Sequence, residues 1–373
     1  MNMENFGRLM AGICAHALAA PGRPLRWIII ANPIAGGFTI KSRWKRNYAA
    51  LEDYAERARK LPSREDARPA ATASAAAATA ADAALGCYGL VLTTGPGHAA
   101  RIAEAVLAEA ASGDVAPAEA FYLIICAGGD GTSLDVQCAL YAAGPAVREH
   151  CAVLRLPFGT GNDGADAWEI PGALDLLTRP SRIEKARALR LLTSTPGKGP
   201  FLAFNILSVG LDAFVTHMTN RMKGRLPGDS YKLWVDIASL LYDRIYKVGP
   251  LDIRLTGEGG EAKLRETALL LAVGASGRRT YGSHKLILPD DRNVCLVRQM
   301  PLLRKLALKD LFTTGRHADR PESLLCNASR VEFSGSYPIL AQMDGETVLL
   351  KPEDFPAAIE LSDAVIPVLK TFP

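Results

Sequence analysis

Two strand-like runs in the middle of the chain each lead directly into a glycine-rich turn, and this arrangement narrows the available folds most. Residues 121–127 (FYLIICA) precede GGDGT at 128–132, and residues 151–157 (CAVLRLP) precede FGTGND at 158–163. A short, mostly apolar run closed by Gly, Asn or Asp is typical of a buried strand followed by a turn. Strands separated by helical segments predict a parallel sheet covered by helices.

The same pattern begins earlier in the chain. Residues 25–31 (LRWIIIA) and 88–94 (YGLVLTT) are further strand candidates, and we expect a helix over 97–111. These segments predict an α/β, Rossmann-like domain over residues 25–165. Residues 1–24 favour a short extension or an amphipathic helix over a signal peptide, and the Ala-rich stretch at about 62–84 favours an exposed insertion.

From about residue 180 the pattern changes to many short strand candidates with few long helices between them. This texture predicts a β-rich, mainly antiparallel domain over 166–352, with helices over 234–246 and 302–312. The final segment, residues 353–373, is apolar enough to pack back on the first domain.

Composition excludes several classes of protein. The 43 Lys and Arg against 39 Asp and Glu give a net charge of +4, which is too mild to indicate nucleic-acid binding. The 7 cysteines are scattered without a Cys-x-x-Cys pair, which argues against a disulfide framework or a zinc site and favours a reducing, cytoplasmic compartment. No apolar run reaches the ~18 residues of a membrane span.

The two glycine-rich turns have the chemistry of an anion site. Successive backbone N–H groups at a strand-to-helix turn can surround a phosphate. Asp130 would repel that phosphate unless a metal ion or a proton transfer is involved. A plain capping turn is the alternative for each motif, but two such turns at neighbouring strand ends favour one shared nucleotide site.

Three weaker motifs accompany them. Asn32 and Gly36 follow the first strand; Thr93 lies at the end of the second, and Gly97 and His98 follow it. The Asp-Gly-Glu sequence at residues 344–346 reads by itself as a surface hairpin tip.

Taken in order, these motifs resemble the catalytic domain of the diacylglycerol kinase family of lipid kinases, which includes bacterial soluble lipid kinases, sphingosine kinases and ceramide kinases. The resemblance runs from about Trp27 to the C-terminus. Besides the five motifs above, it includes Asn205, Ser208, Gly210, Asp212 and Ala213, and the segment at residues 302–317 (LLRKLALKDLFTTGRH).

The resemblance implies a β-sandwich-like second domain and transfer of the ATP γ-phosphate to a lipid hydroxyl, with diacylglycerol as the default substrate. It makes Glu346 the candidate general base and Asp130 the candidate contact to Mg²⁺–ATP and the rival base. Asp291 corresponds to a structural metal position. The residues expected to line or support the nucleotide are Asn32, Thr93, Gly128, Gly129, Gly131, Thr132, Gly159, Thr160 and Asn162.

Several positions depart from the family pattern. Residues 133–135 read Ser-Leu-Asp where the family often has x-Asn-Glu, and residues 164–167 (GADA) lack the usual aromatic and Arg. Residues 291–294 (DRNV) replace Asp-Gly-x-Leu. The ATP core is therefore better matched than the lipid pocket or a second metal.

Two other functions remain open: an NAD kinase-like or other small-molecule kinase, and an inactive regulator that binds nucleotide or lipid.

A lipid kinase also implies peripheral contact with an anionic membrane at its inner, cytoplasmic face. Two basic regions could supply it; a solvated charged face is the alternative for each. The resemblance makes a homodimer plausible. The basic regions are Lys41, Arg43, Lys45 and Arg46 beside Trp44 and Tyr48, and Arg298, Arg304, Lys305, Lys309 and Arg316.

Overall fold

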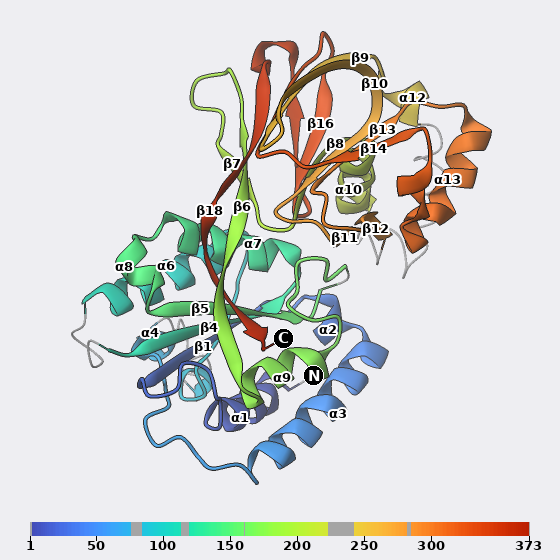
Figure 1. Ribbon diagram of the computed structural model, residues 1–373. Helices are drawn as coiled ribbons and strands as arrows, with labels where there is room; N and C mark the ends of the chain where they lie inside the picture. The colour runs from blue at the N-terminus through green and yellow to red at the C-terminus, as the bar shows by residue number, and fades with distance from the viewer. Residues whose placement is uncertain are drawn as a thin grey trace. The chain divides into compact units, whose positions relative to one another are not determined.

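The computed structural model describes residues 2–75, 84–112, 119–159, 161–222, 242–281 and 285–372. The chain forms two compact units (Figure 1): residues 1–186 with 364–373, and residues 187–363. The sequence-based division placed the boundary after residue 165. The resemblance implies that the first domain binds ATP and that the second binds the lipid substrate, and both roles remain predictions.

The first unit is built on a parallel sheet. β4 (Phe121–Gly128) pairs with β1 (Leu25–Ala31) on one side and with β5 (Cys151–Pro157) on the other. β1 also pairs with β3 (Leu90–Leu92) and with the short β2 (Arg68–Pro69). All of these pairings are parallel. β4 is buried along its whole length, which explains its unbroken apolar sequence.

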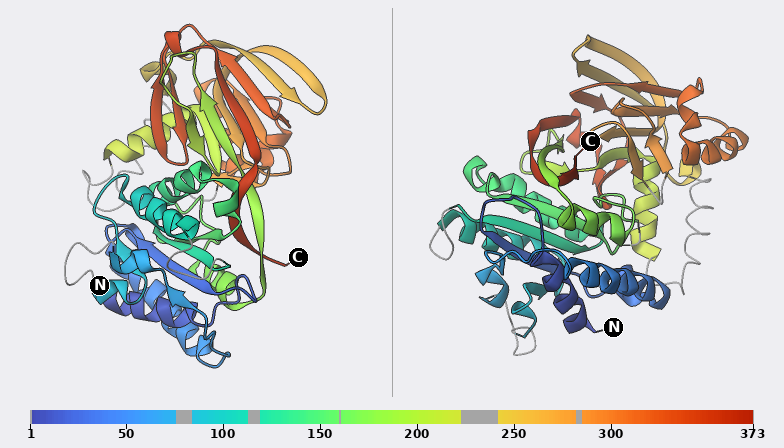
Figure 2. Two further views of the ribbon diagram at one scale, coloured as in Figure 1. Left: turned by 90° about the vertical axis from the view of Figure 1, so that its left-hand side faces the viewer. Right: turned by 60° about the horizontal axis from the view of Figure 1, so that its bottom comes forward.

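Helices cover both faces of this sheet (Figure 2). α6 (His98–Ser112) and α7 (Asp130–Ala142) lie on one face. The other face carries α1 (Met3–Cys14), α3 (Lys41–Ala58) and α9 (Ile170–Thr178). Of the two alternatives expected for residues 1–24, a short extension or an amphipathic helix, the structure shows a helix over Met3–Cys14. It buries Phe6, Met10 and Ile13 in the core of the unit.

The Ala-rich stretch is packed rather than wholly exposed. Ala67, Ala70 and Ala73 are each at most 3% exposed, and α4 (Ala71–Ala75) follows β2. Residues 76–83 lie outside the described residues. Ala was expected to bury too little surface, but its small side chain lets this backbone approach β1 closely.

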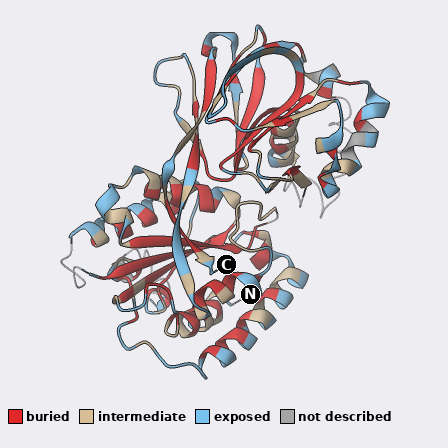
Figure 3. Cartoon of the chain, in the orientation of Figure 1, coloured by how far each residue is buried: buried red, intermediate tan, exposed pale blue. Residues whose placement is uncertain are grey.

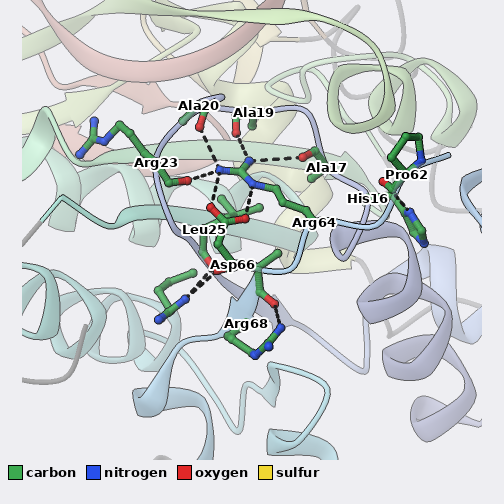
Figure 4. A network of polar contacts seen from close by, with 12 residues as sticks. His16, Ala17, Ala19, Ala20, Arg23, Leu25, Pro62, Arg64, Asp66 and Arg68 are labelled. Atoms are coloured by element: carbon green, nitrogen blue, oxygen red, sulfur yellow. Dashed lines mark hydrogen bonds and ion pairs between the residues drawn. The ribbon is translucent and has the colours of Figure 1, made fainter. Parts of the chain in front are cut away.

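Arg64 holds the segment between α1 and β1 in place (Figure 4). Its guanidinium donates to the carbonyl oxygens of Ala17, Ala19, Ala20 and Arg23. Five N–H donors in a fixed fork allow one Arg to satisfy several carbonyl groups that no helix or strand uses. This contact closes the turn between α1 and β1.

The second unit is mostly antiparallel. Its central strand, β10 (Gly260–Gly274), pairs first with β9 (Pro250–Gly257) and then with β8 (Ile206–Gly210) and β13 (Val294–Arg298). β16 (Ile339–Met343) joins β8 to β17 (Glu346–Leu350). Strand interiors are buried in both units (Figure 3). The predicted fold class is confirmed.

The remaining elements of the second unit extend or cover these strands. β15 (Arg330–Ser334) pairs with β9, and β14 (Ser323–Cys326) pairs with β13. α10 (Leu211–Met222) packs on β8 and β16, and α13 (Leu302–Thr314) confirms the predicted second helix. The helix expected over 234–246 lies mostly outside the described residues; its end is α12 (Tyr242–Ile245).

Two strands pass from one unit to the other. β6 (Ser181–Leu192) leads into the second unit, where it pairs with β7 (Phe201–Ala203). β18 (Ala357–Thr371) pairs with β15 near its start and, through Val368, with Val153 of β5 near its end. The end of the chain thus joins the first unit's sheet beside β5, and β18 also pairs with β6.

Candidate functional site

Asp130 occupies the first position of α7, at the end of the central strand β4. The preceding turn is compact: a Cβ on Gly128 would lie 2.6 Å from Oγ1 of Thr132. Only glycine fits there, because real side chains do not approach so closely. The N–H groups of the first turn of α7 have no partners within the helix, so they can bind an anion.

The turn after β5 lies directly against the turn after β4. A Cβ on Gly159 would be 2.7 Å from the Cα of Gly129, so the backbones of the two turns touch here and a side chain at position 159 would not fit. Arg43 of α3 donates to the carbonyl oxygen of Gly159 at 3.4 Å. The structure thus brings together two turns that the sequence assigned to one site. Thr160, also expected there, lies outside the described residues.

Asn162 shapes this second turn. It has a positive φ of 59°, which Asn tolerates better than most residues, and its Nδ2 donates to the carbonyl oxygen of Pro157 at 3.2 Å. Its Oδ1 is buried and has no hydrogen-bond partner among the described residues. An unsatisfied buried oxygen is costly, so it points to a ligand or water at this place.

Two carboxylates border the same turn. The N–H of Gly164 donates to Oδ1 of Asp130 at 3.3 Å. A Cβ on Gly161 would lie 3.2 Å from Oδ2 of Asp130 and 2.9 Å from Oδ2 of Asp163. Asp130 and Asp163 therefore face a common space over Gly161. Oxygen atoms from carboxylates and amides are the ligands that Mg²⁺ prefers, so these residues fit such an ion.

Asn32 connects the end of β1 to this turn region, and Thr93 connects the end of β3 to β1. Asn32 donates through its backbone to Ala127 at 2.9 Å and through Nδ2 to Oγ1 of Thr132 at 3.4 Å. Thr93 donates through its backbone to Ala31 at 2.9 Å. The role of Asn32 visible here is to hold the turns.

Asp135 holds the loop that follows Thr93. Gly97 donates its N–H to Oδ2 of Asp135 at 3.1 Å. Burial raises the pKa of Asp135 above its ordinary value, and the Gly97 N–H and Arg101 offset only part of that rise. Next to it, His98 accepts from the N–H of Thr94 at 3.0 Å. His98 therefore acts as a loop contact here.

A buried ion pair underlies the turn after β5, and sequence reasoning missed it. Arg155 and Asp166 are 2.7 Å apart, with side chains 8% and 0% exposed. Asp166 also accepts the backbone N–H of Arg155 at 2.8 Å, and Arg155 reaches Gln137 of α7 at 3.4 Å. An Arg within a core strand was the available signal, because a buried guanidinium needs a carboxylate partner.

In the second unit, the Asp-Gly-Glu turn joins β16 to β17. The carboxylate of Asp344 accepts the backbone N–H groups of Phe204, Asn205 and Ile206 at 2.5 to 3.1 Å. Its φ of 45° is the left-handed conformation that Asp can adopt. Asp344 is thus a structural anchor, and it leaves Glu346 exposed at the start of β17.

Asp291, the expected structural metal ligand, is instead paired with Arg278 at 2.7 Å, and both side chains are largely exposed. Arg278 lowers the pKa of Asp291. A guanidinium in this position competes with a cation. Across the described ranges, no group of three or more His, Cys, Asp and Glu side chains is arranged to hold a metal ion.

The basic regions differ in how free their cations are. In the region that includes α13, Arg298 pairs with Glu266, Arg304 pairs with Glu322, and the buried Lys305 pairs with Asp243. On α3, Lys41, Lys45 and Arg46 are exposed. No helix in the described parts of the chain is both long and apolar enough to cross a membrane.

Residues 83–193 match the family model described as the diacylglycerol kinase catalytic domain, so the resemblance seen in the motifs is confirmed for this part of the chain. The matched part contains Thr93 and both glycine-rich turns; Asn32, Asp291 and Glu346 lie outside it. Over these residues the chain thus matches the model of a kinase-family domain.

Solved structures share the fold. A crystal structure from Bacillus anthracis str. Sterne, provisionally described as a diacylglycerol kinase, has a TM-score of 0.55 and 16% identity, covering 94% of this chain and 96% of its own. A second structure from this organism, described as a diacylglycerol kinase, has a TM-score of 0.52 and 15% identity, covering 93% and 97%. No curated protein shows significant sequence similarity to the chain.

Proposed function

We propose that this protein is an ATP-dependent lipid kinase that transfers the γ-phosphate to a lipid hydroxyl, with a diacylglycerol as the first substrate to test. The observation that carries the proposal is the pair of turns after β4 and β5, which bring Gly129 and Gly159 into contact beside Asp130. This pair lies within the residues that match the kinase-family domain.

The proposed nucleotide site uses the backbone more than side chains. Phosphoryl transfer needs positioning and charge neutralisation rather than covalent chemistry by the protein. The N–H groups of residues 129–132 would bind phosphate oxygens, while Asn32 and Thr132 hold the turn in place. Asp130, Asp163 and the free Oδ1 of Asn162 would hold Mg²⁺, which supplies charge neutralisation of the phosphates when bound.

The lipid hydroxyl must also lose a proton. Glu346 is our candidate general base, because it is an exposed carboxylate on a turn that Asp344 fixes by three backbone hydrogen bonds. Asp130 remains the rival base. For contact with an anionic membrane, we propose the exposed cations of α3, since those near α13 are largely engaged in ion pairs.

The test is transfer of labelled γ-phosphate from Mg·ATP to a mixed lipid extract, with NAD and a sugar phosphate in parallel reactions. The proposal predicts label in a chloroform-soluble product that is absent with Asp130→Asn. Label in NAD or the sugar phosphate, with none in lipid, would assign a different kinase activity. ATP binding without transfer to any acceptor would favour an inactive regulator.

A further inference from the structure

The turn that carries Glu346 is linked to a buried carboxylate by one side chain, Gln342 of β16. The N–H of Gly345 donates to Oε1 of Gln342 at 3.2 Å. From its other side, Gln342 donates through Nε2 to Oγ of Ser208 at 3.0 Å and to Oδ2 of Asp212 at 3.3 Å. Gln342 is 0% exposed, so water does not compete for these bonds.

The direction of these hydrogen bonds is fixed by chemistry. A backbone N–H can only donate, so the atom of Gln342 that faces Gly345 must be the carbonyl oxygen. The amide nitrogen then faces Asp212, whose carboxylate can accept. Ser208 donates to the same Oδ2 of Asp212 at 2.6 Å. Ser208, Asp212 and Gln342 therefore form one connected network on β8, α10 and β16.

Asp212 is the titratable member of this network. Burial raises its pKa to about 6, although the hydrogen bonds from Ser208 and Gln342 and the charge of Lys285, at the start of β12 (Lys285–Leu288), act in the opposite direction. Protonation would remove the charge that holds the Gln342 amide. The effect would reach Gly345 through the same side chain.

The other contacts of the turn lack this link. Asp344 is held by backbone N–H groups, and the carbonyl oxygen of Gly345 accepts from Asn220 at 2.8 Å. Neither contact includes the network of Asp212. A second titratable group lies close by: Nδ1 of His217 contacts Oγ1 of Thr347 at 3.2 Å, and burial and Arg221 lower the pKa of His217. Gln342 is the side chain that joins the N–H of Gly345 itself to Asp212, so the Gln342→Met variant separates the effect of Asp212 from that of His217.

We propose that Gln342 and Asp212 are positioning residues that fix the orientation of the 344–346 turn and hence of Glu346. This inference deepens the proposed function and rests on it for its effect on activity. The hydrogen-bonded connection from Asp212 through Gln342 to Gly345, here called the relay, is a property of the fold. It can therefore be measured without substrate.

The first test is spectroscopic. In ¹⁵N-labelled protein, the amide resonance of Gly345 should shift with pH between 5 and 7, with a midpoint near that of Asp212. Gln342→Met removes the connection and should abolish the shift. A Gly345 resonance that does not respond in the wild type, or that responds equally in Gln342→Met, would overturn the relay.

Ser208→Ala guards against a variant that fails to fold. It removes one donor to the ionised form of Asp212, so the midpoint should move to higher pH while the Gly345 response persists. An unmoved midpoint would show that Ser208 and Asp212 are not coupled.

The second test uses activity. Gln342→Glu keeps the acceptor for Gly345 but places a second carboxylate beside Asp212. At pH 6 the pair can share a proton, and kcat should stay within about threefold of the wild type. At pH 8 both groups ionise and repel, and kcat should fall at least about tenfold while the KM for ATP changes little.

Asn293→Asp is the matched control for this test. Asn293 is a buried amide in the same unit, which bonds both to the N–H and to the carbonyl oxygen of Ala328. The Asn293→Asp variant should have a lower free energy of unfolding, but its kcat should not fall between pH 6 and pH 8 as that of Gln342→Glu does. A Gln342→Glu profile parallel to the wild type would overturn the positioning role. If the wild type transfers no phosphate at all, the proposed function fails, while the Gly345 resonance still decides the relay.

Discussion

At the scale of single residues, Asp130 bears most of the proposed chemistry. Its Oδ1 accepts the N–H of Gly164, and its Oδ2 faces the same space as Asp163. Asp130→Asn keeps the shape and a hydrogen-bond acceptor but removes the charge that a metal needs. We expect Mg·ATP binding to weaken and kcat/KM to fall by about 10²–10³. Calorimetric titration with Mg·ATP and initial rates would measure the two effects.

For Glu346 we expect an effect on the rate of transfer but not on nucleotide binding. Glu346→Gln should reduce kcat by about 10²–10⁴, because an amide cannot accept the proton of a lipid hydroxyl. The equilibrium affinity for Mg·ATP should stay the same. Rates at saturating ATP, with nucleotide affinity measured separately, check this prediction. Unchanged kcat would transfer the role of base to Asp130.

At the scale of elements, the turn after β5 depends on the buried pair of Arg155 and Asp166. Asp166→Ala leaves a buried guanidinium without its partner and should cost about 3–5 kcal/mol in the free energy of unfolding. Asp53→Ala breaks the exposed pair with Arg57 and should cost less than about 1 kcal/mol. Urea unfolding of both variants provides the comparison. Equal losses would show that the pair does not support the turn.

The strands that the sequence predicts best are those with continuous apolar runs. β4 and β1 fall in this class, because their burial on both faces leaves a strong pattern. β14 and β16 escaped prediction. The apolar pattern of β16 is broken by Gln342, whose polar partners come from residues far away in the sequence.

The same reason limits prediction of the site. The glycine-rich turns and Asp130 are local signals, and the structure brings the turns together. Asp344 was expected only as part of the Asp-Gly-Glu motif, without a role of its own. Its three backbone partners lie about 140 residues earlier, so no local pattern could reveal them.

At the scale of the whole molecule, acid stability should depend strongly on one buried carboxylate. Asp354 is 1% exposed, which would raise its pKa, but hydrogen bonds from Lys198, the Lys351 N–H and Thr195 lower it to about 2. A carboxyl whose pKa is lower in the folded protein than in the unfolded chain stabilises the fold at pH values above its ordinary pKa, which is near 4. This stabilisation, on the order of 2 kcal/mol, is lost as pH falls from about 4 to 2.

Asp354→Asn tests this directly. At pH 7 the variant should be less stable than the wild type by about 2 kcal/mol, and the difference should shrink as pH approaches 2. Thermal unfolding followed at a series of pH values measures both. A constant difference across this range would contradict the assignment.

The central claim is that the turns after β4 and β5 bind Mg·ATP for transfer to a lipid hydroxyl. The most direct measurement is ³¹P NMR of the protein with Mg·ATP and a short-chain diacylglycerol, beside a reaction with Asp130→Asn. We predict a new phosphomonoester resonance that grows in step with ADP in the wild type and is absent in the variant. ADP appearing only with inorganic phosphate, or the same phosphomonoester in both samples, would contradict the account.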